Sequence, residues 1–174
     1  MLVETQLLEA QPTRTVPPSS RWATTRGDHA GLPAVPAHVF PHRSASQLLA
    51  LARRGLDDAA EQRADGLRYA TAHLAALRAA AALVAARAKP VPSPRSKLTS
   101  VWDLLTIVAP ALGEWAAYFA ASASKRAAAE AGIPRVVSAR EADDLVRAAA
   151  SFIAIVDRAV GHLAAPALLD DLVA

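Results

Sequence analysis

Cysteine is absent from this chain of 174 residues. Its absence excludes disulfide bonds, zinc sites built on thiolates and cysteine nucleophiles, and it fits a reducing compartment. Aromatic residues are also scarce at 5%, so the 53% hydrophobic fraction comes largely from alanine. Because alanine favours helices and lets them approach closely, we expect a predominantly helical protein.

Lysine occurs only at Lys89, Lys97 and Lys125, so arginine supplies most of the positive charge. The net charge is +3 and the pI is about 9.8. A preference for alanine and arginine over lysine is what a GC-rich genome produces, which weakens the inference from a high pI to a nucleic-acid partner. The charge balance is therefore only a mild indication of such a partner.

Long apolar runs are missing too, because a charged residue or a histidine interrupts every helical stretch before the roughly 18 residues that span a bilayer. The N-terminal segment carries Glu4 and Glu9 where a secretory signal would be basic. We therefore expect a soluble, cytoplasmic protein with no membrane partner.

Motifs of the familiar enzyme classes are also absent, among them the Gly-rich phosphate loop, the nucleophile elbow and the dinucleotide fingerprint. His38 and His42 have the spacing of a helical zinc pair, but Pro41 between them prevents that helix. Adjacent carboxylates such as Asp57 and Asp58 diverge by about 100° on a helix, so they are not arranged to chelate a metal. We expect neither a metal nor a cofactor.

Prolines and glycines are frequent in residues 1–43, which show no sustained hydrophobic periodicity. This composition predicts a disordered, Pro-rich tail. Residues 44–165 form the predicted helical domain, and residues 166–174 a short C-terminal tail. Inside the domain, the Pro-rich connector of residues 89–99 is expected to be an exposed loop without regular structure.

Four amphipathic elements are predicted between these tails. Ser44 or Ser46 caps the first, and the second runs from about residue 64 to 88, ending before Pro90. Capping boxes open the third at Ser100 and the fourth at Ser138. Pro110 must kink or split the third element, and Gly132 ends it.

These elements predict an all-α fold, an up-and-down four-helix bundle with short connections between antiparallel neighbours. The large core residues are expected to be Trp102, Trp115, Phe119 and Phe152. In the second element, apolar residues recur at steps of three and four, and we expect this stripe to face the core. The stripe consists of Leu67, Ala70, Leu74, Leu77, Ala81 and Val84.

Arg68 and His73, on the second element, are the candidate catalytic pair. A metal-independent ribonuclease needs an acid or base that works near neutral pH, which suits histidine, and a permanent cation on the phosphate, which suits arginine. Five positions on a helix amount to roughly 500°, so the two side chains point about 140° apart. We expect His73 to flank the core and Arg68 to lie towards solvent, so that the pair converges only across a dimer interface or where the helix begins between them.

Four cations without an acid among them surround the connector, and they are the candidate nucleic-acid-binding residues. They are Arg87, Lys89, Arg95 and Lys97. Without interleaved aromatic residues they would contact a phosphate backbone non-specifically and in a salt-sensitive way. The alternative interpretation is that they are solvated loop charges.

Residues 52–60, 68–88, 102–133 and 138–153, taken in this order, resemble the HEPN superfamily, in particular the small stand-alone HEPN proteins of actinobacteria. The resemblance covers about residues 46–162. It implies a bundle of about four helices that is commonly dimeric. Many HEPN domains cut RNA with an Arg-x4-6-His motif, whereas others lack the motif and serve as nucleotide-binding or non-catalytic partners.

The resemblance also implies that the ribonuclease motif lies near the junction of the third and fourth helices. That stretch contains Arg126, Arg135 and Arg140 but no histidine, and only Arg68 and His73 satisfy the spacing. Our leading hypothesis is a non-catalytic module that binds RNA, a nucleotide or a protein partner, as a homodimer or with that partner. The alternatives are a metal-independent endoribonuclease using Arg68 and His73, and a structural adaptor.

Overall fold

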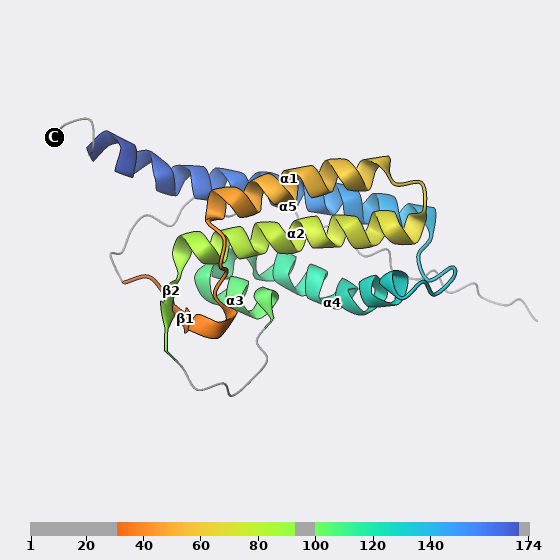
Figure 1. The fold of residues 1–174 in the computed structure, drawn as a ribbon, viewed down its shortest axis with the longest axis horizontal. Helices are drawn as coiled ribbons and strands as arrows, with labels where there is room; N and C mark the ends of the chain where they lie inside the picture. The colour runs from red at the N-terminus through yellow and green to blue at the C-terminus, as the bar shows by residue number, and fades with distance from the viewer. Residues whose placement is uncertain (1–30, 93–99, 171–174) are drawn as a thin grey trace, which may run out of the picture.

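The computed structural model describes residues 31–92 and 100–170, with the side chains of residues 164–170 excepted. Within these ranges the molecule is mostly helical, as predicted, with five α-helices, two short 3-10 helices and one two-stranded sheet (Figure 1). The elements are, in chain order, β1 (Ala34–Pro36), η1 (Ala37–Val39), α1 (Ala45–Glu61), α2 (Asp65–Arg87), β2 (Lys89–Val91), α3 (Val101–Val108), η2 (Pro110–Leu112), α4 (Gly113–Glu130) and α5 (Ala139–Asp170).

Hydrogen-bonded serines start two of the long helices and the short α3. Ser44, rather than Ser46, caps α1, and its hydroxyl accepts from the backbone N–H of Gln47 at 3.2 Å. The predicted capping box at Ser100 is present at the start of α3. At α5, the Ser138 hydroxyl accepts from the backbone N–H of Glu141 at 3.3 Å. These side chains satisfy amide groups that a helix N-terminus otherwise leaves unpaired.

Pro110 divides the predicted third element, as its lack of a backbone N–H requires. The α3 helix ends at Val108, Ala109 leaves the helical region with φ −148° and ψ 71°, and η2 leads into α4. The division is confirmed, and the described part of the chain therefore has five α-helices. The four-helix bundle stays an interpretation of how these helices pack.

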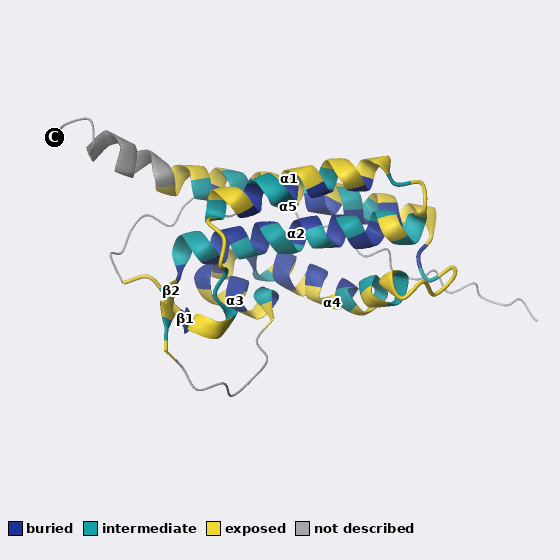
Figure 2. Cartoon of the chain, viewed as in Figure 1, coloured by how far each residue is buried: buried dark blue, intermediate teal, exposed yellow. Residues whose placement is uncertain are grey.

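Helix α2 lies at the centre of the molecule and contacts α1, α3, α4 and α5. It is long and apolar enough to cross a membrane by length and composition alone, but most of it is buried against the other helices. In Figure 2 it lies between α1 and α4, and half-buried positions recur along it. The core helix of a folded domain meets the same length criterion, so this finding adds no membrane prediction.

The predicted apolar stripe on α2 is confirmed in part, because Ala70 and Val84 are buried and Leu77 and Ala81 pack against the core. Leu67 is 52% exposed, and Leu74, Leu77 and Ala81 are only half-buried. The buried face of α2 is instead built largely from small residues, which let the neighbouring helices approach its backbone closely. These residues include Ala72, Ala75, Ala76, Ala79, Ala80 and Ala82, with Ala70 and Val84 from the predicted stripe.

The aromatic core is as predicted, because Trp102, Trp115, Phe119 and Phe152 are all buried. Their rings form one cluster between α3, α4 and α5. The ring centroids of Trp102 and Phe119 are 5.2 Å apart and stacked, and those of Phe119 and Phe152 are 5.3 Å apart. Offset and tilted pairs at these separations stabilise a core beyond the area that they bury.

Regular structure extends beyond the segments where we expected it. Residues 34–39, in the predicted tail, form β1 and η1, and β1 pairs in parallel with β2 in the predicted connector. Val35 is fully buried in the core, and the Lys89 N–H donates to the Pro33 carbonyl at 2.9 Å. The burial of Val35 explains why this Pro-rich strand is ordered. At the other end, α5 runs to Asp170, past the predicted domain end at 165.

Candidate functional site

His73 lies in the core of the molecule and not at its flank. Its side chain is 1% exposed, and its ring meets Trp102 and Phe119 edge-on, with centroids 5.8 and 6.0 Å away. The Nε2 atom is 3.0 Å from the Phe119 carbonyl oxygen. Because a carbonyl only accepts, Nε2 carries the proton, and Nδ1 is left buried without a hydrogen-bond partner among the described residues. This arrangement favours the neutral imidazole with its proton on Nε2.

The electrostatic surroundings of His73 favour this neutral form. Burial is the largest influence and lowers the pKa of His73, against the opposing effect of the hydrogen bond to the Phe119 carbonyl. Among charged groups, Arg126 lowers this pKa and Glu130 raises it. A protonated ring would also place a second N–H, on Nδ1, in an apolar environment without an acceptor.

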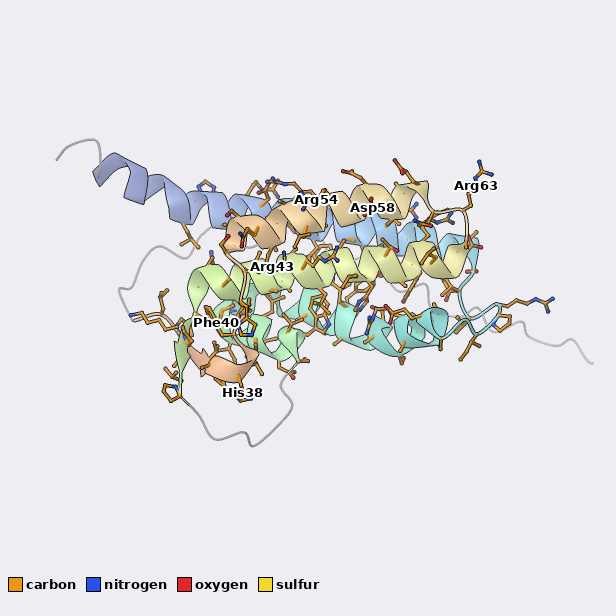
Figure 3. All side chains as sticks on the ribbon, viewed as in Figure 1. His38, Phe40, Arg43, Arg54, Asp58 and Arg63 are labelled. Atoms are coloured by element: carbon orange, nitrogen blue, oxygen red, sulfur yellow. The ribbon has the colours of Figure 1, made fainter. Side chains whose placement is uncertain are left out.

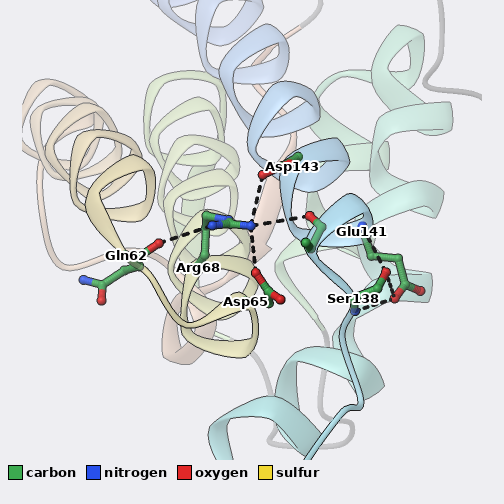
Figure 4. Close-up of polar contacts among 7 residues, drawn as sticks. Gln62, Asp65, Arg68, Ser138, Glu141 and Asp143 are labelled. Atoms are coloured by element: carbon green, nitrogen blue, oxygen red, sulfur yellow. Dashed lines mark hydrogen bonds and ion pairs between the residues drawn. The ribbon is translucent and has the colours of Figure 1, made fainter.

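Arg68 lies where α2, the α1–α2 turn and the start of α5 meet (Figure 4). The expectation that it faces solvent is wrong, since its side chain is only 17% exposed. Its Nη2 atom is 2.8 Å from the Asp65 carboxylate and 3.1 Å from that of Asp143. Weaker hydrogen bonds reach the carbonyls of Gln62 at 3.4 Å and Ala139 at 3.5 Å. The two Nη groups are thus occupied by the protein's own acceptors, whereas Nε is buried without a hydrogen-bond partner among the described residues.

Arg68 and His73 therefore contact different parts of the molecule. The described polar contacts of Arg68 are with the α1–α2 turn, its own helix and the start of α5, whereas His73 contacts α3 and α4. No hydrogen bond joins the two side chains within the described residues. The observed directions agree with the roughly 140° that separates the two positions on a helix.

Two charged residues near His73 were given no role from the sequence, although Arg126 was noted in the stretch where the ribonuclease motif is expected. Arg126 and Glu130, one turn apart on α4, form a pair in which Nη1 lies 2.8 and 3.0 Å from the two carboxylate oxygens. The spacing of four indicates a pair on one helix face. Which face of α4 would lie towards His73 depends on tertiary packing, so the sequence carried no signal for it.

The structure describes two of the four connector cations, Arg87 and Lys89. Arg87 is half-buried at the end of α2, and burial alone lowers its pKa, with no carboxylate partner among the described ion pairs. Lys89 is exposed in β2. Arg95 and Lys97 lie outside the described residues. The structure thus places the first two cations on either side of the junction between α2 and β2.

The histidines considered as metal ligands are not assembled. His38 is exposed in η1 beside β1 (Figure 3), and His42 is exposed before α1. In the part of the chain that the structure describes, no three histidine, cysteine, aspartate or glutamate side chains are grouped to hold a metal ion.

Comparison with known families supports the resemblance seen in the order of the segments. The family model HEPN_SAV_6107-like HEPN matches residues 59–157, which is more than half of the 174-residue chain. The match begins near the end of α1 and includes α2, α3, α4 and more than half of α5. Searches of curated proteins and of solved structures found no match. On the strength of the family match, the chain belongs to the HEPN_SAV_6107-like HEPN family.

Proposed function

We propose that this HEPN domain is a non-catalytic module that binds the phosphate groups of RNA or a nucleotide. The placement of His73 is the observation that carries the proposal. A general acid or base must come within hydrogen-bond reach of the proton that it transfers, either directly or through one water. The ring of His73 is buried, and its one protonated nitrogen is directed at the Phe119 carbonyl.

Arg68, the second residue of the candidate catalytic pair, supports the same proposal through its ion pairs. A phosphate-binding arginine presents its planar donors to the ligand, often two at a time. Arg68 instead donates to carboxylates of Asp65 and Asp143. Binding of a phosphate there would compete with two carboxylates that are already in place.

The choice of phosphate as the ligand rests on Arg87 and Lys89. Arg87 is half-buried and has no carboxylate partner among the described ion pairs, so its charge is partly desolvated without compensation. A phosphate oxygen would supply the missing counter-charge. Arg95 and Lys97, six and eight residues beyond Lys89 in the sequence, would extend the contact along a phosphate backbone.

A cleavage assay tests the absence of catalysis. Purified protein and the variant R68A/H73A are incubated with structured and single-stranded RNA in EDTA, with circular dichroism as a check that the variant is folded. We expect neither protein to cut RNA. Cleavage by the wild type and not by the variant would instead establish the metal-independent endoribonuclease and overturn the proposal.

A fluorescence-anisotropy titration at low salt tests binding. We expect the wild type to bind single-stranded RNA, and R87A/K89A to bind more weakly, with a salt slope reduced by about 1.4 for two lost phosphate contacts. R54A is the matched control, because Arg54 is exposed and has no ion pair among the described contacts. No RNA binding at low salt would contradict the proposal and favour the structural adaptor.

The proposal includes assembly of the domain as a homodimer, as the family resemblance implied. Light scattering across a concentration series should give twice the mass of the 18.2 kDa chain. A monomer at every concentration would contradict the dimer. It would also remove the cross-interface arrangement that the endoribonuclease alternative requires of Arg68 and His73.

A further inference from the structure

One face of α2 is only partly covered although the helix contacts four others: Leu67 is exposed, whereas Ala81 and Ala85 are half-buried against the core. Two rows of residues, each with a spacing of seven, run along this face, and none of them is buried. We call this face the α2 stripe. It consists of Leu67, Leu74 and Ala81 in one row and Thr71, Arg78 and Ala85 in the other.

Helical geometry places the α2 stripe between α1 and α4. His73 faces α4, where it meets the Phe119 carbonyl. Ala75 faces α1, where an added Cβ at Gly55 would lie 3.4 Å from the Ala75 Cβ. Leu74 is between them in the sequence, about 100° from each, so it points between the two helices. Figure 2 agrees with this placement, because it shows α2 between α1 and α4.

The chemistry of the α2 stripe is apolar with one cation. Leu67 is 52% exposed, an unusual position for a leucine in a helix that otherwise forms the core. Arg78, near the middle of the stripe, extends over α1, where its Nη1 atom lies 3.4 Å from the Leu51 carbonyl and beside Gly55, and it has no carboxylate among the described ion pairs. A fitting occupant would therefore be a short apolar segment that carries negative charge.

Residues 2–10 of the same chain have this chemistry. The sequence LVETQLLEA contains four large aliphatic residues, Glu4 and Glu9, and no lysine, arginine or histidine. Elsewhere in residues 1–30 the large apolar residues are isolated among prolines and polar residues. The segment complements the α2 stripe in both hydrophobicity and charge.

The length of the connecting chain allows this contact. The twenty residues 11–30 lead to Gly31, close to β1, and can span at most about 70 Å. Helix α2 has 23 residues and is about 35 Å long. Because β1 pairs with β2, which follows the end of α2, the tether starts near one end of the stripe and reaches its whole length. Tethering at this range gives an effective concentration of about a millimolar.

We propose that residues 2–10 dock on the α2 stripe of their own chain, with their aliphatic side chains on Leu67, Leu74 and Ala81 and a glutamate paired with Arg78. The interaction covers apolar surface on α2 that the described helices leave exposed at Leu67 and half-buried at Leu74 and Ala81. It does not depend on the proposed phosphate binding, which involves other residues.

Disulfide cross-linking tests the proposal cleanly, since the native chain has no cysteine. The full-length variant Q6C/T71C places one thiol in the segment and one on the α2 stripe. Its matched control, Q6C/A154C, places the second thiol at an exposed position on α5. Under mild oxidation we expect an intrachain disulfide in Q6C/T71C at a rate about tenfold or more above the control, because docking raises the local thiol concentration.

Equal rates in the two variants would overturn the proposal, and so would a predominantly interchain disulfide, which would assign the stripe to a second copy. The charge pairing has its own test. Adding R78E to Q6C/T71C should slow the cross-link, and adding E4K and E9K to that protein should restore it. An unchanged rate in the R78E variant would contradict the pairing with Arg78, while circular dichroism verifies that the helices are intact.

Discussion

At the scale of single residues, burial decides what the one candidate catalytic histidine can do. The spacing of Arg68 and His73 showed that they diverge on a helix, and the structure agrees. The spacing did not show that His73 is in the core or that Arg68 is drawn in by carboxylates on two helices. Those facts depend on residues far away in the sequence, such as Phe119 and Asp143.

The buried imidazole predicts a pH dependence of stability. The pKa of His73 is lowered in the folded state from its ordinary value of 6.5, so the unfolded chain binds the proton more readily. The free energy of unfolding is therefore highest above pH 6.5 and falls as the pH drops below it, by at most about 1.4 kcal/mol per pH unit. Urea denaturation between about pH 7.5 and 5.5 measures the effect.

H73L is the matched control, because it fills the core without a titrating group, and the Phe119 carbonyl keeps its hydrogen bond from the Ser122 hydroxyl at 2.8 Å. The wild type should lose more stability than H73L over this pH range. Equal losses would mean that His73 is not buried as described.

Arg68 is predicted to stabilise the fold and not to take part in catalysis. R68A removes the donors that join the start of α2 to Asp143 and Ala139 at the start of α5. Hydrogen bonds to charged groups contribute about 1.5–3 kcal/mol, and partial exposure of the carboxylates reduces this to about 1–2 kcal/mol. Chemical denaturation should show this loss for R68A and a change within about 0.5 kcal/mol for R54A. Similar values for both variants would contradict the assigned role.

At the scale of helices and strands, local signals were readable and distant pairings were not. The boxes at Ser100 and Ser138 and the break at Pro110 depend on neighbouring residues, so the sequence predicted them. The sheet joins residues 34–36 to residues 89–91 across η1, α1 and α2. Short Pro-rich segments have no periodicity that would reveal such a pairing.

The start of α5 predicts a second, more acidic pH dependence. The pKa of Glu141 is lowered from 4.5 to about 2, first by the hydrogen bond from Lys125 and then by that from the Ser138 N–H. The stabilising effect is therefore complete above pH 4.5 and is lost as the pH falls towards 2. E141Q keeps the capping geometry without the charge. Acid unfolding followed by circular dichroism should give the wild type a steeper loss than E141Q below pH 4.5, and parallel curves would contradict the assignment.

Val35 is predicted to hold the sheet to the helical core. Its side chain is fully buried, so V35A should lower the free energy of unfolding by about 2 kcal/mol through lost burial and a residual cavity. A34S, at the exposed neighbouring position, should change it by less than about 0.5 kcal/mol. Urea denaturation compares the two. If V35A were as stable as A34S, β1 would not be anchored in the core.

At the scale of the whole molecule, the arrangement around α2 departs most from expectation. Leucines at steps of three and four indicated the core face, yet the neighbouring helices pack on the alanine faces and leave Leu67 exposed. Both faces of α2 are apolar, so periodicity alone did not distinguish them. Small side chains allow closer helix packing, and Leu67 and Leu74 belong to the surface on which we propose that the N-terminal segment docks.

The account as a whole depends on His73 being a neutral core residue in a HEPN domain that does not cut RNA. Nitrogen-15 NMR of the histidine rings tests this most directly, because it reports the charge and the protonated nitrogen of each ring. At pH 6.5, where a free histidine is half-protonated, His73 should be neutral, with its proton on Nε2. A His73 ring that is half-protonated at this pH, or that carries its proton on Nδ1, would contradict the account.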